Sequence, residues 1–193
     1  FVWADLNGDG NPDATLLDGT GQLHVFLNER SGKFREVPVP SGFSAVSAIA
    51  VADVDREGPL GLLAVRRSGT ISSLAMTNDS HGWTVSDVAT VPDAANYLAA
   101  DVRLRVADLD NNGAFDILLA PVASARSPLI WLQGADRKFQ LMSKPSAAAL
   151  VFGAADLKSD GRLDLLELSS DGHAIVAANQ GTKQYHGQTI RPR

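Results

Sequence analysis

The sequence predicts an all-β fold made of small repeated sheets. Apolar runs of four or five residues alternate with turn residues along the chain, which is typical of strands and not of helices. A nine-residue acidic loop recurs four times, with its first aspartate at Asp5, Asp53, Asp108 and Asp156. The interval of about 50 residues is the length expected for one four-stranded sheet per repeat, as in a β-propeller blade.

The first unit shows the expected order of elements. One strand precedes the acidic loop, a second strand follows it, and the turn at residues 18–21 leads into a third strand. A further turn at residues 31–33 leads into a weaker fourth strand. The strands of this unit are expected at 1–4, 14–17 and 23–27, and from Phe34 onward.

The other three units repeat this order. Their first three strands are expected at 48–52, 62–65 and 70–74, at 104–107, 117–120 and 128–132, and at 151–155, 165–168 and 174–177. Fourth strands are expected to begin at Trp83 and Phe139, whereas none is evident in the polar, basic tail 183–193. The segment 94–100 is expected to add a short helical turn.

These elements predict four consecutive four-stranded blades of a β-propeller within one region, residues 1–193. The units span about 1–40, 41–92, 100–145 and 146–193. We expect the four blades to be part of a larger ring, with a closed small ring as the alternative. The chain opens on Phe1 rather than Met and shows no signal peptide, so we expect a processed product or a fragment of a longer parent.

The composition excludes several classes of function. The net charge of −5 and the absence of a basic patch argue against nucleic-acid binding. No apolar run approaches the ~20 residues that a membrane-spanning helix needs, so we expect no membrane insertion. The chain has no cysteine, which excludes disulfides, thiolate zinc sites and cysteine catalysis.

Loops one and three carry the oxygen-bearing residues that a Ca²⁺ site needs. Carboxylate or amide oxygens stand at loop positions 1, 3, 5 and 9, glycine at position 6 permits the bend, and position 7 offers its backbone carbonyl. Ca²⁺ is favoured over Mg²⁺, which demands a tighter octahedron and keeps its waters. The candidate ligands are Asp5, Asn7, Asp9, Asn11 and Asp13 in loop one, and Asp108, Asp110, Asn112, Ala114 and Asp116 in loop three.

Loops two and four are weaker copies of the same pattern. In loop four Lys158 replaces the ligand at position 3, and its ammonium could stand in for an ion among Asp156, Asp160 and Asp164. In loop two Glu57 is long for position 5 and Gly61 supplies no ligand at position 9, so we expect that site to be empty. The alternative for every copy is an Asp- and Gly-rich turn without a cation.

Catalysis is not expected from these carboxylates. A glycosidase acid and base occur once per active site, whereas here the acidic clusters recur at the same place in each repeat. No G-x-S-x-G nucleophile elbow is present. Trp3, Trp83 and Trp131 lie in expected strands and are interpreted as core, with sugar stacking as the alternative for one of them.

The repeated loop resembles a known family of repeats. Residues 4–13 and the stretch that begins at Val106 are similar to FG-GAP/VCBS repeats, the blades of integrin-alpha-type β-propellers. The pair Leu27-Asn28 and the stretch at 32–34 also resemble that family after the third strand. The resemblance covers nearly the whole chain as four units. It implies a calcium-stabilised propeller, usually of seven blades, in an extracellular, cell-surface or periplasmic setting.

Three functions are compatible with this reading. The first is a non-catalytic calcium-binding module that binds or scaffolds a protein or glycan ligand. The others are a non-catalytic propeller part of a polysaccharide-active enzyme and a carbohydrate-binding lectin. Exposed edge strands on a partial ring would also invite self-association of two copies.

Overall fold

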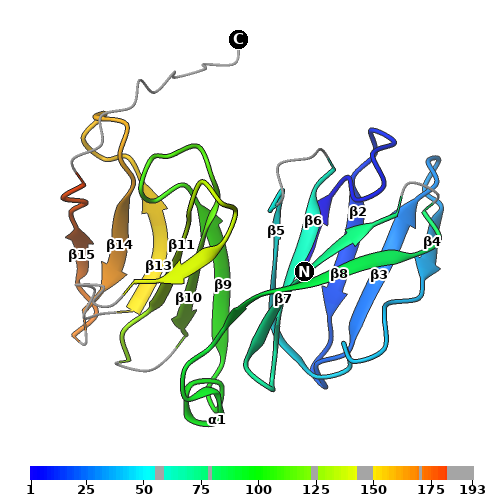
Figure 1. Ribbon diagram of the computed structural model, residues 1–193, viewed down its shortest axis with the longest axis horizontal. Coiled ribbons are helices and arrows are strands. Elements are labelled where there is room, and N and C mark those ends of the chain that lie inside the picture. The colour runs from blue at the N-terminus through cyan, green and yellow to red at the C-terminus, as the bar shows by residue number, and fades with distance from the viewer. Residues whose placement is uncertain (55–58, 78–79, 123–125, 143–149, 170, 182–193) are drawn as a thin grey trace.

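The computed structural model describes residues 1–54, 59–77, 80–122, 126–142, 150–169 and 171–181. These residues form an all-β molecule of four antiparallel sheets that follow one another along the chain (Figure 1). Within each sheet every strand pairs with the next strand in the sequence. We number the sheets one to four in chain order.

Sheets one to three have four strands each, and sheet four has three within the described residues. Sheet one contains β1 (Val2–Ala4), β2 (Asp13–Leu17), β3 (Leu23–Asn28) and β4 (Phe34–Val37), and sheet two contains β5 (Val46–Ala52), β6 (Gly61–Arg66), β7 (Thr70–Met76) and β8 (Trp83–Thr90). Sheet three contains β9 (Val102–Ala107), β10 (Asp116–Pro121), β11 (Leu129–Gln133) and β12 (Phe139–Leu141), and sheet four contains β13 (Leu150–Ala155), β14 (Asp164–Leu168) and β15 (Ala174–Ala177).

The strands expected from the sequence are confirmed, each within a few residues at its ends. The helical turn expected at 94–100 is α1 (Ala94–Tyr97), which lies between sheets two and three. Its Tyr97 hydroxyl donates to the carbonyl of Leu119 at 2.9 Å, which fastens the helix to sheet three. The tail 183–193, in which no fourth strand was expected, lies outside the described residues.

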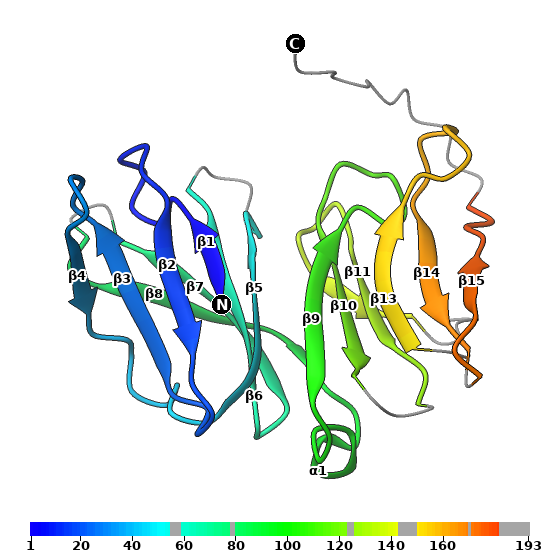
Figure 2. The same ribbon diagram turned by 180° about the vertical axis from the view of Figure 1, so that it is seen from behind.

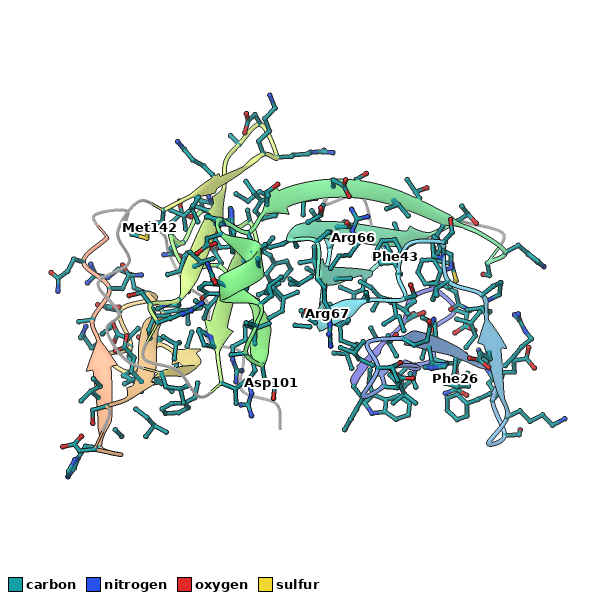
Figure 3. The ribbon with its side chains drawn as sticks, turned by 90° about the horizontal axis from the view of Figure 1, so that it is seen from below. Phe26, Phe43, Arg66, Arg67, Asp101 and Met142 are labelled. Atoms are coloured by element: carbon teal, nitrogen blue, oxygen red, sulfur yellow. The ribbon has the colours of Figure 1, made fainter. Side chains whose placement is uncertain are left out.

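The sheets stack face to face around an arc, which Figure 2 shows from behind and Figure 3 shows from below. In sheets one to three the first strands lie beside one another, because β1 contacts β5 and β5 contacts β9, whereas between sheets three and four β10 contacts β13. The three apolar cores fill the spaces between successive sheets: one between sheets one and two, one between sheets two and three, and one between sheets three and four.

Each inner sheet therefore has two apolar faces. We call the face toward the preceding sheet the front face and the face toward the following sheet the back face. Residues paired across neighbouring antiparallel strands share a face, so the register defines the two sets. The front face carries Val51, Leu62 and Leu74 in sheet two, and Val106, Ile117 and Trp131 in sheet three.

The connections that hold the acidic loops lie along one edge of the arc. The β1–β2, β9–β10 and β13–β14 connections all lie at the top in Figure 1, whereas α1 lies at the opposite edge. No helix in the described part of the chain is long and apolar enough to cross a membrane.

Candidate cation sites in the acidic loops

In loops one, three and four the backbone is folded around the aspartate at the first position. In loop three, one carboxylate oxygen of Asp108 accepts the N–H of Asn112 at 2.9 Å and the other accepts the N–H of Gly113 at 2.8 Å. Asp5 in loop one and Asp156 in loop four accept the N–H groups at the same two loop positions. The first carboxylate is thus positioned by the backbone alone.

The glycine at position 6 makes this turn possible. Gly10, Gly113 and Gly161 have φ angles of 82°, 82° and 80°, in the left-handed region that other residues adopt only with strain. No atom lies within 4 Å of the Cβ that a side chain would add at Gly10 or Gly113. Glycine is therefore needed at these two positions because of the backbone conformation, and not because a side chain would clash with a neighbour.

The aspartate at position 9 is buried and fastens the loop to the third strand of its own sheet. Asp116 accepts the N–H of Leu109 at 2.7 Å with one oxygen, and the N–H of Gln133, at the end of β11, at 2.8 Å with the other. Asp13 accepts the N–H groups of Leu6 and Asn28 in the same way, both at 2.9 Å. This role of position 9 is additional to the ligand role expected from the sequence.

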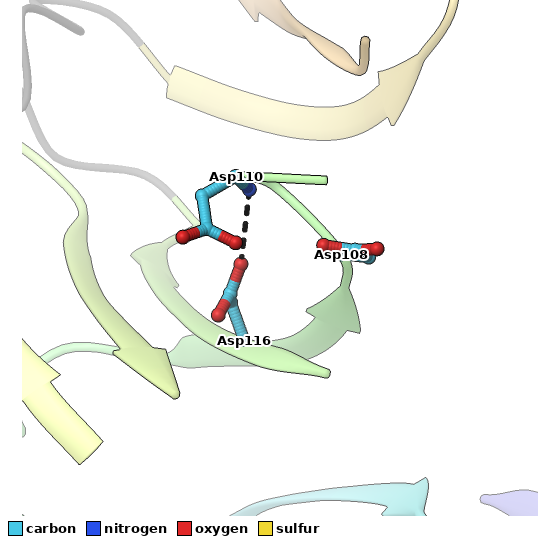
Figure 4. A group of neighbouring side chains, drawn as sticks. All are labelled: Asp108, Asp110 and Asp116. Atoms are coloured by element: carbon cyan, nitrogen blue, oxygen red, sulfur yellow. Dashed lines mark hydrogen bonds between the residues drawn. The ribbon is translucent and has the colours of Figure 1, made fainter. Parts of the chain in front are cut away.

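Loop three brings three carboxylates together. Ligand oxygens of Asp108, Asp110 and Asp116 lie within 4.8 Å of one another (Figure 4), and Asp110 donates its N–H to Asp116 at 3.3 Å. Among the described residues, this is the one group of three or more Asp, Glu or His side chains with such spacing. Three anionic groups at this separation repel one another unless a cation or protons lie among them.

The pKa of Asp116 reflects this environment. Burial raises it from 3.8 to about 6, against the opposing effect of the N–H donors from Gln133 and Leu109, and nearby Asp110 raises it further. Burial also raises the pKa of Asp13 in loop one. A buried carboxylate with a raised pKa is one that a bound cation would stabilise in its ionised form.

Loop one holds its position-5 carboxylate differently. One oxygen of Asp9 accepts the N–H of Asn11 at 2.9 Å and the side-chain amide of Asn11 at 2.7 Å, and the other accepts the amide of Asn7 at 3.3 Å. These bonds lower the pKa of Asp9, the backbone bond from Asn11 most of all. Asp5, Asp9 and Asp13 therefore do not form a carboxylate group with the spacing found in loop three.

Loop four carries its own positive charges. The Lys158 ammonium lies 3.1 Å from a carboxylate oxygen of Asp164, and the Arg162 guanidinium lies 2.5 Å from Asp160. The pKa of Asp164 is lowered, first by the N–H of Asn179 and then by Lys158, which is the opposite direction to Asp116. The structure thus places Lys158 where the sequence suggested, and adds Arg162, which sequence reasoning missed.

Comparison with known families agrees with the repeat pattern. Residues 5–64, which include loop one and the second strand of sheet two, match the family model of the FG-GAP-like repeat. The family resemblance expected from the loop residues is therefore confirmed over this part of the chain. A search of curated proteins found no match.

The FG-GAP-like segment also contains loop two, in which Asp55 and Glu57 lie outside the described residues. Position 9 of this loop is Gly61, the first residue of β6. A Cβ at Gly61 would lie only 3.0 Å from the carbonyl oxygen of Leu74, so a carboxylate could not be added there without moving β7. The expectation of an empty site in loop two stays a prediction.

Sequence reasoning missed the amide side chains that end the third strands. Gln133 donates its side-chain amide to the carbonyl of Val54 in loop two at 2.7 Å, and Asn179 donates to the carbonyl of Leu109 in loop three at 2.7 Å. Each bond joins one unit to the loop of the unit before it. A polar residue ending an apolar strand is the signal that could have revealed them.

Proposed function

We propose that this chain is a non-catalytic, calcium-binding β-propeller module that binds or scaffolds a protein or glycan ligand. The convergence of Asp108, Asp110 and Asp116 in a repeated loop carries the calcium part of this proposal. All three supply the oxygen donors that Ca²⁺ prefers, and Asn112 and the Ala114 carbonyl belong to the same loop. The equivalent residues of loop one form the second site.

The blade arrangement is supported by the order of the sheets. Each sheet is an antiparallel meander, successive sheets pack face to face, and the first strands of sheets one to three lie beside one another. These are the features of propeller blades. The four blades would then belong to a larger ring.

The cation would have a structural role. In loops one and three position 9 already holds the loop to its third strand, so an ion shared with positions 1, 3 and 5 would couple the loop backbone to that strand. Sites of extracellular grade bind Ca²⁺ with dissociation constants of about 10⁻⁴–10⁻³ M, which suits the cell surface or the periplasm and not the cytosol. The loops would leave the rest of the surface for the ligand.

Thermal unfolding with and without calcium tests the proposal. We expect ~10 mM Ca²⁺ to stabilise the protein by about 1–3 kcal/mol per filled site relative to metal-free protein, because the ion binds only the folded loops. The Asp5→Ala/Asp108→Ala double variant should lose this gain. Asp136→Ala, in an exposed turn of sheet three, serves as the matched acidic control and should keep it. If calcium does not raise the unfolding midpoint of the wild type, the loops are acidic turns that bind no cation at this concentration.

We expect the calcium stabilisation to shrink as the pH falls from about 7.5 to about 5. The folded metal-free protein holds a proton on Asp116 up to about pH 6, whereas the unfolded chain releases it near 3.8. Between these values lower pH therefore favours the folded metal-free state, while calcium must displace the proton to bind. Thermal unfolding midpoints of metal-free and calcium-loaded protein, measured at both pH values, check this prediction. If calcium raised the midpoint equally at the two pH values, the prediction would be wrong.

Lys158→Asn should create a calcium site in loop four. The change restores the position-3 amide found at Asn7 and removes the ammonium that neutralises Asp164. We expect calorimetric titration to show one additional bound Ca²⁺ per chain. Lys138→Asn, which removes a positive charge from a turn outside the acidic loops, is the matched control and should leave the stoichiometry unchanged. An unchanged stoichiometry in Lys158→Asn would mean that Arg162 alone suffices to block the site.

A further inference from the structure

Two Asn-Gly pairs occur in the chain, and both lie in acidic loops. Asn7-Gly8 occupies positions 3 and 4 of loop one, whereas Asn112-Gly113 occupies positions 5 and 6 of loop three. At an Asn-Gly pair the backbone nitrogen of glycine can attack the asparagine side chain with little hindrance, because glycine has no Cβ and adopts many backbone conformations. The two pairs thus carry the same chemistry at different places in the same kind of loop.

The nucleophilic nitrogen of the pair in loop three is bound. Gly113 donates its N–H to a carboxylate oxygen of Asp108 at 2.8 Å, a bond strengthened by the charge of the acceptor. The carboxylate also disfavours the negative charge that this nitrogen has to carry when it loses its proton and attacks. The Asn112 side chain is held as well, because its Nδ2 donates to the Gln133 carbonyl at 2.8 Å and its Oδ1 accepts the Ala114 N–H at 2.7 Å.

The same two groups are held more weakly in loop one. No residue in the described part of the chain accepts the N–H of Gly8. Among these residues the Asn7 side chain bonds to Asp9 alone: its Oδ1 accepts the backbone N–H at 3.2 Å, and its Nδ2 donates to the carboxylate at 3.3 Å. Both distances lie at or beyond the long end of the usual range of about 2.7–3.2 Å, so the Asn7 side chain can turn toward Gly8 at little cost.

The backbone of the loop decides which nitrogen is available for attack. The N–H groups at positions 5 and 6 donate to the position-1 aspartate in loops one, three and four. The N–H at position 4 has no such acceptor, and this also holds for Asn111 in loop three, whose sheet packs between two others. A neighbouring sheet on each side therefore does not occupy the position-4 nitrogen, and an Asn-Gly pair at positions 3 and 4 keeps its nucleophile.

We propose that Asn7-Gly8 is a site of spontaneous deamidation and that the loop protects Asn112-Gly113 from the same reaction. The backbone nitrogen of Gly8 attacks Cγ of Asn7 and forms a C–N bond, and the side-chain nitrogen leaves as ammonia with the proton that Gly8 gives up. Water then opens the cyclic imide at either of its carbonyl groups, which gives aspartate or isoaspartate at residue 7. The reaction consumes only water and needs no cation, so it does not depend on the proposed calcium binding.

The two products would change loop one in different ways. Aspartate places a carboxylate at position 3, as Asp110 does in loop three. Isoaspartate routes the main chain through the former side chain and lengthens it by one carbon atom, which moves Asp9 relative to Asp5. Because Asn7 is a candidate ligand, either product alters the candidate cation site of loop one and leaves loop three as it is.

Peptide mapping by mass spectrometry on the metal-free chain tests this proposal. In the native protein we expect Asn7 to deamidate at least about tenfold faster than Asn112, because attack at Asn112 first requires the loss of a hydrogen bond to an ionised group. In urea the loops are unfolded, so both pairs should deamidate at about the same rate. Equal rates in the native protein, or a tenfold ratio that persists in urea, overturns the proposal. Metal-free buffer keeps the result independent of whether the loops bind calcium.

A pair of variants tests the protecting hydrogen bond directly. Asp108→Ala removes the acceptor of the Gly113 N–H and should raise the deamidation rate at Asn112 by about tenfold. Asp136→Ala, which removes a carboxylate outside the acidic loops, is the matched control and should leave this rate unchanged. Circular dichroism checks that each variant is folded, and the comparison of wild type with and without urea depends on neither. A wild-type rate at Asn112 in Asp108→Ala would show that this bond does not protect the pair, and the proposal would be wrong.

Discussion

Asp116→Ala should destabilise the protein by about 2–4 kcal/mol even when no calcium is present. The carboxylate is fully buried and accepts N–H groups from Leu109, Asp110 and Gln133. Its removal leaves these donors without an acceptor in a site closed to water, and it separates loop three from the end of β11. Urea denaturation of metal-free wild type and variant measures the difference in unfolding free energy.

Asp108→Ala is the comparison variant, because it removes the carboxylate at position 1 of the same loop. Asp108 accepts two N–H groups within the more exposed part of the same loop, so we expect a cost of only about 1 kcal/mol without calcium. In calcium, both variants should also lack the stabilisation supplied by the loop-three site. Equal costs for the two variants in metal-free buffer would show that position 9 has no role beyond ligation.

Trp131→Ala should cost about 3–5 kcal/mol of unfolding free energy. Trp131 is buried in the core between sheets two and three, where it packs with Leu63 and Ile71 of the preceding sheet. Truncation leaves a large cavity that the strands on both sides cannot close. Chemical denaturation monitored by circular dichroism avoids the loss of the tryptophan signal.

Phe26→Ala is the matched substitution at the equivalent place in sheet one. Phe26 is half-buried on a face that no other described sheet covers, so we expect a loss of about 1 kcal/mol or less in the monomer. If Phe26→Ala and Trp131→Ala lowered the unfolding free energy equally, the two positions would not differ in burial, and the described stacking of the sheets would be contradicted.

The positions of the strands could be predicted because each unit marks them twice, by short apolar runs and by the fixed place of the acidic loop between the first two strands. The run at 23–27 and the turn before it, for example, predicted β3 (Leu23–Asn28) almost to the residue. That Asp108, Asp110 and Asp116 belong to one loop could be predicted for the same reason, whereas their role as ligands stays a prediction. Their types and spacing are local features of nine consecutive residues.

Contacts between units could not be predicted in this way. The bond from Gln133 to Val54 spans 79 residues, and nothing in either local sequence points to the other. Alternation along a strand shows that two faces exist, but it does not show which neighbour covers each face. The pairing of Arg162 with Asp160 was missed because loop position 7 was considered only for its backbone carbonyl.

Loop four differs from loops one and three in how the charge of its carboxylates is compensated. In loop four Lys158 and Arg162 are permanent counterions, so the charge there is the same in every calcium concentration. Loops one and three have only acidic and neutral side chains at their ligand positions, and their charge would follow the surrounding calcium. The distribution of charge along the arc would then differ between a calcium-poor and a calcium-rich medium, while the charge of loop four would stay the same.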